Sequence, residues 1–121
     1  MWNRVRWFNS TNQYQLFFSG RFGKFMKLWI DDIRIAPNDW HWVKTSEEAI
    51  AAFIYNTITE VSFDHDLGGE DTGYKVAEYI EFAAQFGFQP RIKWQVHSAN
   101  PVGRKRIAAA MNSAERFWNV D

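Results

Sequence analysis

From residue 26 onward, short apolar runs alternate with longer stretches of helical periodicity. Apolar runs bounded by polar or turn-forming residues predict strands at residues 27–30, 41–45, 60–63 and 91–96. Apolar residues that recur at three- and four-residue spacing predict helices at residues 46–56, 74–86 and 101–117. Strands that alternate with helices in this way are typical of βαβ units, so we expect an α/β domain with a parallel sheet.

Local signals indicate where the helices begin and end. Thr45 with Glu48 three residues later forms a capping-box pattern in front of the first helix. Asn100 precedes a proline, which suits the first position of a helix, and Gly87 can end the helix over residues 74–86. Residues 34–40 contain Pro37 and Asn38 and indicate a loop where many α/β folds have a helix.

The two ends of the chain do not follow this pattern. Residues 1–25 mix aromatic, polar and basic positions without a clear period, and a second methionine, Met26, stands beside the first strand. We therefore expect an N-terminal extension over residues 1–25 and a domain over residues 26–121, with an added edge strand at residues 14–18 as the alternative. Residues 117–121 could supply a last edge strand.

Composition narrows the class of protein. The chain has 121 residues, 46% of them hydrophobic, which suits one domain with one core. Its 14 basic and 14 acidic residues cancel, so duplex DNA is not an expected partner. The lack of cysteine excludes disulfides and thiolate chemistry and suits the cytoplasm. No apolar run approaches the roughly 20 residues of a membrane helix, so no membrane partner is expected. The oligomeric state is left open.

Unusual polar residues follow directly on three of the predicted strands. Asp31 and Asp32 follow the first strand, residues 64–66 (Asp-His-Asp) follow the third, and residues 97–100 (His-Ser-Ala-Asn) follow the fourth. The carboxyl ends of parallel strands share one rim, where ligands of open α/β sheets bind. We therefore expect these three segments to form one site.

Carboxylates that meet at one rim repel each other unless a positive group joins them. Oxygen ligands suit a hard divalent cation, and we expect Mg²⁺ or Mn²⁺. The expected metal ligands are Asp31, Asp32, Asp64 and Asp66.

Two histidines are candidates for proton transfer. His65 stands between two aspartates, which would stabilise its charged form and make it a general acid. Alternation along an extended chain would instead turn it behind the site, hydrogen-bonded to backbone. His97 ends its strand beside Ser98, a possible phosphate donor, and is the better placed of the two to touch substrate. Asn100 is either a helix cap or a ligand contact.

Several groups near the same rim could bind an anion. The helix that starts after Asn100 offers free backbone N–H groups, Gly103 and the basic side chain of Arg104. Arg34, two residues beyond the aspartate pair, is a further phosphate clamp. Trp40 and Trp42 could stack on a nucleobase, but packing against the neighbouring helix is the interpretation that we favour. A metal, histidines and anion donors together indicate a ligand that contains phosphate.

The motifs "LWIDDIRIAP", "VSFDHDLG…DTGY" and "VHSANPVGRKRI" together resemble the cyclic-phosphate-processing receiver-like domain, a relative of two-component receiver domains. The resemblance covers about Leu28 to Met111. It implies a flavodoxin-like three-layer sandwich with strand order 2-1-3-4 and a possible fifth strand, in which the loop over residues 34–40 replaces the usual first helix. It also implies a hydrolase that opens a cyclic nucleotide or an RNA 2′,3′-cyclic phosphate end. The site residues that it implies are Asp31, Asp32, Arg34, Asp64, His65, Asp66, His97, Ser98, Asn100 and Gly103.

Two other functions use the same residues. A phospho-accepting receiver also has an acidic pair after its first strand and an aspartate after its third, but its expected lysine after a fifth strand has no counterpart here. A protein that binds a cyclic nucleotide without cleaving it would use the same phosphate contacts. Catalysis would differ from binding by a positioned water and an acid for the leaving oxygen.

Overall fold

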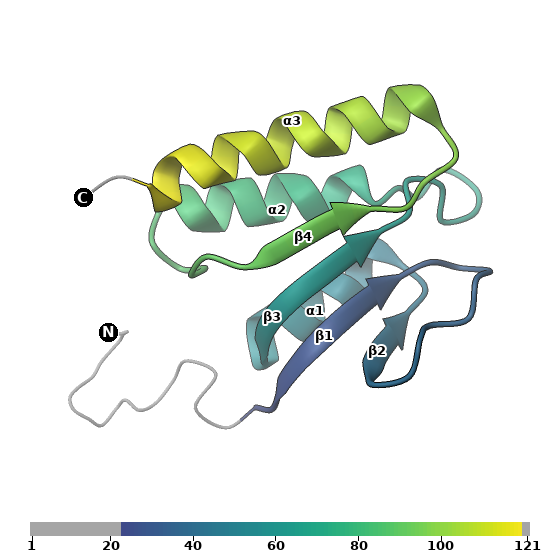
Figure 1. The fold of residues 1–121 in the computed structure, drawn as a ribbon, viewed down its shortest axis with the longest axis horizontal. Helices are drawn as coiled ribbons and strands as arrows, with labels where there is room; N and C mark the ends of the chain where they lie inside the picture. Colours follow the sequence, from purple (N-terminus) through teal and green to yellow (C-terminus); the bar gives the residue numbers. More distant parts are fainter. Residues whose placement is uncertain (1–22, 120–121) are drawn as a thin grey trace.

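The computed structural model describes residues 23–119 of the chain (Figure 1). Its elements are β1 (Phe25–Ile30), β2 (Trp40–Val43), α1 (Ser46–Tyr55), β3 (Thr57–Phe63), α2 (Tyr74–Gln85), β4 (Lys93–Val96) and α3 (Pro101–Trp118). The four strands are parallel and lie in the order β2-β1-β3-β4. The predicted receiver-like α/β fold and its strand order are therefore confirmed.

The three described helices lie on the same face of the sheet. The connections from β2 to β3 and from β3 to β4 both progress across the sheet in the same direction. Because connections between parallel strands are right-handed, the helices in these two connections, α1 and α2, lie on the same face. α2 packs between α1 and α3, and Figure 1 shows α1 behind β1 and β3. The connection from β1 to β2 progresses in the opposite direction, so a helix in it would cover the other face of the sheet. This connection is a loop, as predicted, and adds no helix there. The described residues thus form two of the three layers expected of the sandwich.

Alternation along the strands builds the core between the sheet and these helices. Leu28 and Ile30 of β1 and Phe63 of β3 are fully buried, whereas Lys27 on the opposite face of β1 is exposed. The helices contribute fully buried apolar residues at helical spacing, namely Val76, Ala77, Ile80, Ile107, Met111 and Ala114. Burial on one face explains the alternation along β1. At the end of β3 it does not hold, because Ser62, on the face opposite Val61 and Phe63, is buried as well.

The predicted helix caps are confirmed. The Thr45 hydroxyl accepts a hydrogen bond from the backbone N–H of Glu48 at 3.0 Å, and the Asn100 side chain caps α3. β2 stops at Val43 rather than at residue 45, because Thr45 takes the cap position of α1. Gly87 adopts a left-handed backbone with φ 79°, which lets the chain leave α2 as predicted.

The C-terminal end of the described region differs from the expectation. Residues 117 and 118 belong to α3, so they form no edge strand, and the Trp118 indole donates to the Gln89 carbonyl at 2.8 Å. Packing of this last turn on the core keeps it helical. The predicted extension over residues 1–25 falls largely outside the described residues, as does the alternative strand at 14–18. Phe25 already pairs with Thr57 in the sheet, one residue before the expected boundary.

None of the described helices combines the length and the apolar character that crossing a bilayer requires.

Candidate functional site

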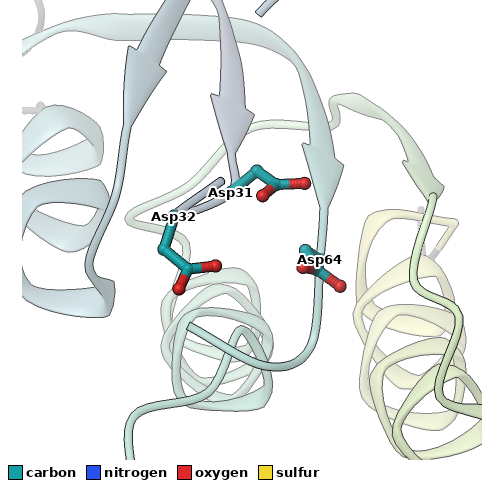
Figure 2. A group of neighbouring side chains, drawn as sticks. All are labelled: Asp31, Asp32 and Asp64. Carbon is teal, nitrogen blue, oxygen red and sulfur yellow. The ribbon is translucent and has the colours of Figure 1, made fainter. Parts of the chain in front are cut away.

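Three carboxylates meet at the carboxyl ends of the two central strands (Figure 2). Asp31 and Asp32 follow β1, Asp64 follows β3, and one oxygen from each lies within 4.8 Å of the others. Asp31 is buried, and the other two are half-buried. Figure 2 shows the three side chains around one small space at the rim. This cluster could hold a metal ion, because its oxygens suit a hard divalent cation and such a cation would offset the repulsion between the carboxylates.

The Asp31 carboxylate is fixed by hydrogen bonds. Its Oδ1 accepts from the backbone N–H groups of Ile33 and Arg34, both at 2.8 Å, and its Oδ2 lies 2.9 Å from Nε2 of His97. Burial acts to raise the pKa of Asp31, but these hydrogen bonds outweigh it and lower the pKa below its usual value. Asp31 is therefore ionised at neutral pH, with a lone pair of Oδ2 left for a cation.

Asp32 and Asp64 present freer carboxylates to the same space. Asp64 accepts a hydrogen bond from the backbone N–H of His65 at 2.8 Å. The Asp32 carboxylate lies close to the backbone of Gly68, so that a Cβ at residue 68 would be 3.3 Å from Oδ2 of Asp32. Gly68 has a left-handed backbone with φ 91°. The glycine-rich loop over residues 64–73 therefore forms one wall of the site.

Asp66 was expected to be a fourth metal ligand, and it is not part of this cluster. Its Oδ1 lies 3.0 Å from Nδ1 of His65, and its Oδ2 accepts from the Asn100 amide at 3.3 Å. These two hydrogen bonds lower the pKa of Asp66, and the hydrogen bond with His65 has the larger effect. Asp66 therefore links the loop after β3 to the start of α3.

His65 is not part of the acidic cluster, but the alternation argument was wrong about its partner, because the ring turns toward the Asp66 side chain rather than toward backbone. Its ring is buried and packs against Gly103 in the first turn of α3. The ring makes its hydrogen bond to Asp66, and its Nε2 is buried without a partner among the described residues. The backbone carbonyl of His65 accepts from the N–H of Gly73 at 2.7 Å.

His97 reaches the acidic cluster. Its Nε2 lies 2.9 Å from Asp31, and its Nδ1 lies 2.7 Å from the hydroxyl of Ser62. Its ring stacks on Trp29 with centroids 4.0 Å apart and planes 4° from parallel. Burial is the main cause that lowers the pKa of His97, against the opposing effect of Asp31. Sequence reasoning did not identify Ser62 or Trp29 as partners, because nothing in the sequence shows that they face each other across β1 and β3.

Most of the groups that were expected to bind an anion are already hydrogen-bonded to other groups of the protein. Asn100 caps α3 by accepting from the N–H of Gly103 at 3.0 Å, and the Ser98 hydroxyl accepts from the N–H of Asn100 at 3.0 Å. The Arg34 side chain donates to the His97 carbonyl at 2.6 Å, and its side chain is exposed at the rim. Arg104 is exposed in the first turn of α3. The two arginines are thus the predicted anion-binding groups whose side chains face solvent.

The tryptophans after the acidic pair pack on the protein. The Trp42 indole donates to the Asp31 carbonyl at 2.6 Å, and Trp40 packs on Trp29 in a T-shaped pair with centroids 5.9 Å apart. These contacts favour packing over a nucleobase platform as the role of both residues.

Asp71 anchors the loop of the site to α1, which sequence reasoning also missed. Its carboxylate accepts from the backbone N–H of Ser46 at 2.8 Å and from the Ser46 hydroxyl at 2.6 Å. Burial opposes ionisation of Asp71, but the Ser46 and Thr72 hydrogen bonds and nearby Lys75 lower its pKa. An acidic residue within a polar loop carries no sequence signal for this long-range contact.

Comparison with known proteins agrees with these observations. Residues 26–113 match the family model described as the cyclic-phosphate processing receiver domain. The match includes Asp31, Asp32 and Asp64. No curated protein and no solved structure matched the chain.

Proposed function

Because the chain belongs to the cyclic-phosphate processing receiver domain family, we propose that it is a metal-dependent hydrolase that opens a cyclic phosphate. The observation that supports this proposal most directly is the cluster of Asp31, Asp32 and Asp64 at the rim. The substrate would be a cyclic nucleotide or an RNA that ends in a 2′,3′-cyclic phosphate. The setting that suits the cysteine-free composition is the cytoplasm.

In this proposal the three aspartates hold Mg²⁺ or Mn²⁺. A cation bound there would supply polarisation of the phosphodiester and a water of lowered pKa. Arg34 and Arg104 are the side chains that would bind phosphate oxygens. Water adds to phosphorus, one ring P–O bond breaks, and the product is a phosphomonoester with a free hydroxyl.

The histidines fit the role of proton donor less well than expected. Both ring nitrogens of His97 contact protein groups, and its side chain is 16% exposed. His65 has a free ring nitrogen, but that nitrogen is buried. The hydrogen bonds of His97 therefore support a structural role rather than proton donation.

A phospho-accepting receiver is the second candidate, because the acidic pair and Asp64 stand where that family holds Mg²⁺ and accepts phosphate. Against it, the described residues form four strands, and the fifth strand that would carry a lysine is not among them. The family to which the chain belongs favours the hydrolase.

The experiment that tests the proposal is a product assay on purified protein. A panel of cyclic nucleotides and cyclic-phosphate-ended RNA is incubated with Mn²⁺, with Mg²⁺ or with a chelator. We expect ring opening that requires the cation and that falls roughly 100-fold or more in Asp64→Asn. Glu70→Gln, an exposed carboxylate change on the same loop, is the matched control and should retain full activity.

Other outcomes would identify the other functions. No turnover together with labelling of Asp64 by acetyl phosphate would establish a phospho-receiver. Tight binding of a cyclic nucleotide that survives unchanged would establish a binding protein. Full activity in a folded Asp64→Asn variant would contradict the proposed metal site.

A further inference from the structure

We propose that His97 is a positioning residue: held by Ser62 and Trp29, it orients the Asp31 carboxylate toward the cation. This inference rests on the proposed function only in that it takes the acidic cluster to bind a divalent cation. It assigns His97 to metal binding rather than to proton donation, and it adds Ser62 and Trp29 to the residues on which the site depends.

The hydrogen bonds define the direction of the His97 ring. An ionised carboxylate can only accept, so Nε2 of His97 carries the proton that lies between it and Oδ2 of Asp31, 2.9 Å away. The Ser62 hydroxyl, 2.7 Å from Nδ1, holds the opposite side of the ring. Each ring nitrogen thus has a protein partner, and the two hydrogen bonds together fix the orientation of the ring.

Packing removes the remaining freedom of the ring. Trp29 covers one face of His97 with planes 4° apart, and its own indole N–H donates to the Arg34 carbonyl at 3.0 Å. Trp29 and Ser62 are register partners on β1 and β3, so the two groups that hold His97 come from the two central strands. The backbone N–H of His97 donates to the Phe63 carbonyl at 2.8 Å, which ties the residue to β3 as well.

The restraint reaches the cation site through Asp31. Backbone N–H groups occupy Oδ1 of Asp31, so Oδ2 is the oxygen that can bind a cation. The N–H of His97 takes one lone pair of Oδ2, so the other lone pair is the one left for a cation shared with Asp32 and Asp64. Partners of this kind, which orient a metal ligand, commonly change metal affinity by about 10- to 100-fold when removed.

The test is Mn²⁺ affinity of the full chain, measured from free Mn²⁺ by electron paramagnetic resonance. We expect His97→Ala to weaken binding by about 10-fold or more. His97→Gln keeps an N–H donor of similar reach, so it should recover most of the affinity. Ser62→Ala should weaken binding by a smaller factor, because it leaves Nδ1 of His97 without its partner. Thr59→Val, which removes an exposed hydroxyl from the same strand, should bind like the wild type.

The outcomes separate this inference from the proposed function. Wild-type affinity in a folded His97→Ala variant, or no recovery in His97→Gln, would overturn the positioning role and leave the metal site intact. Weakened Mn²⁺ binding in His97→Ala without any ring opening by the wild type would uphold the inference and overturn the hydrolase. No Mn²⁺ binding by the wild type would overturn both.

The rate of ring opening gives a second readout, because a positioning residue and a proton donor predict different rates for the same variant. At saturating Mn²⁺, a positioning role predicts that His97→Gln opens the ring within a few-fold of the wild-type rate. Loss of a general acid would instead reduce the rate by about 100- to 10,000-fold at any Mn²⁺ concentration, which would overturn the inference.

Discussion

Gly103 lies directly against the ring of His65, so that a Cβ at residue 103 would be 2.3 Å from Cγ of His65. The sequence suggested Gly103 as a phosphate contact, but its N–H already binds the Asn100 side chain. The absence of a side chain at this position lets α3 approach the loop after β3. His65 and Gly103 therefore connect the acidic end of β3 to the helix that covers it.

We predict that Gly103→Ala destabilises the domain, although alanine favours helices by up to about 1 kcal/mol over glycine. The added Cβ must displace a buried ring, and overpacking of this kind costs about 1–3 kcal/mol. The free energy of unfolding from urea titration measures the change. Val102→Ala, at an exposed position in the same turn, should change stability little, and a Gly103→Ala protein as stable as that control would contradict the packing.

Substitution at Gly68 should affect both stability and cation binding. Gly68→Ala places a side chain at φ 91° and sets its Cβ 3.3 Å from Oδ2 of Asp32. We expect a loss of about 1 kcal/mol or more from backbone strain, together with weaker Mn²⁺ binding because Asp32 must move. Gly69→Ala is the matched control, since Gly69 also has positive φ, 58°, but nothing lies within 4 Å of its Cβ position. Equal Mn²⁺ affinity in the two variants would show that Gly68 does not place Asp32.

Asp71 should make stability depend on acid pH. Its folded-state pKa lies below its unfolded value of about 3.9, so the stabilisation is fully present above that pH and is lost as the pH falls through the folded pKa. Asp71→Asn should therefore lower the free energy of unfolding by about 1–3 kcal/mol at neutral pH, and the difference from wild type should shrink below about pH 4.

Urea titrations between neutral and acid pH measure this difference. Glu70→Gln changes the neighbouring exposed carboxylate and should leave the profile unchanged. A difference between wild type and Asp71→Asn that stays constant down to acid pH would show that the Asp71 charge does not stabilise the link to Ser46.

The start of the domain can be tested by shortening the chain. The carbonyl of Lys24 accepts from the N–H of Thr57 at 2.9 Å, and its own N–H donates to the Asn56 side chain at 3.1 Å. A chain that begins at Met26 loses both hydrogen bonds and should melt several degrees below one that begins at Gly23, since about 1 kcal/mol shifts the midpoint by roughly 4–8 °C. Equal melting temperatures would favour the expected boundary at residue 26.

The sequence determined the elements and their rim. Hydrophobic periodicity and cap residues such as Thr45 and Asn100 are local signals, because the hydrogen bonds that they predict join residues a few positions apart. The meeting of Asp31, Asp32 and Asp64 was also predictable, since it requires only that β1 and β3 be parallel neighbours. The family motifs supplied the strand order.

Tertiary structure alone decided what each polar residue at the rim contacts. Asp66 leaves the cluster and binds Asn100, 34 positions away, while His97 meets Asp31, 66 positions away. Ser62 and Trp29 hold His97 because register places them side by side, and register depends on how whole strands pair. Periodicity along a chain indicates which face a residue occupies, but the partner on that face is set by packing between distant segments, and no local pattern contains it.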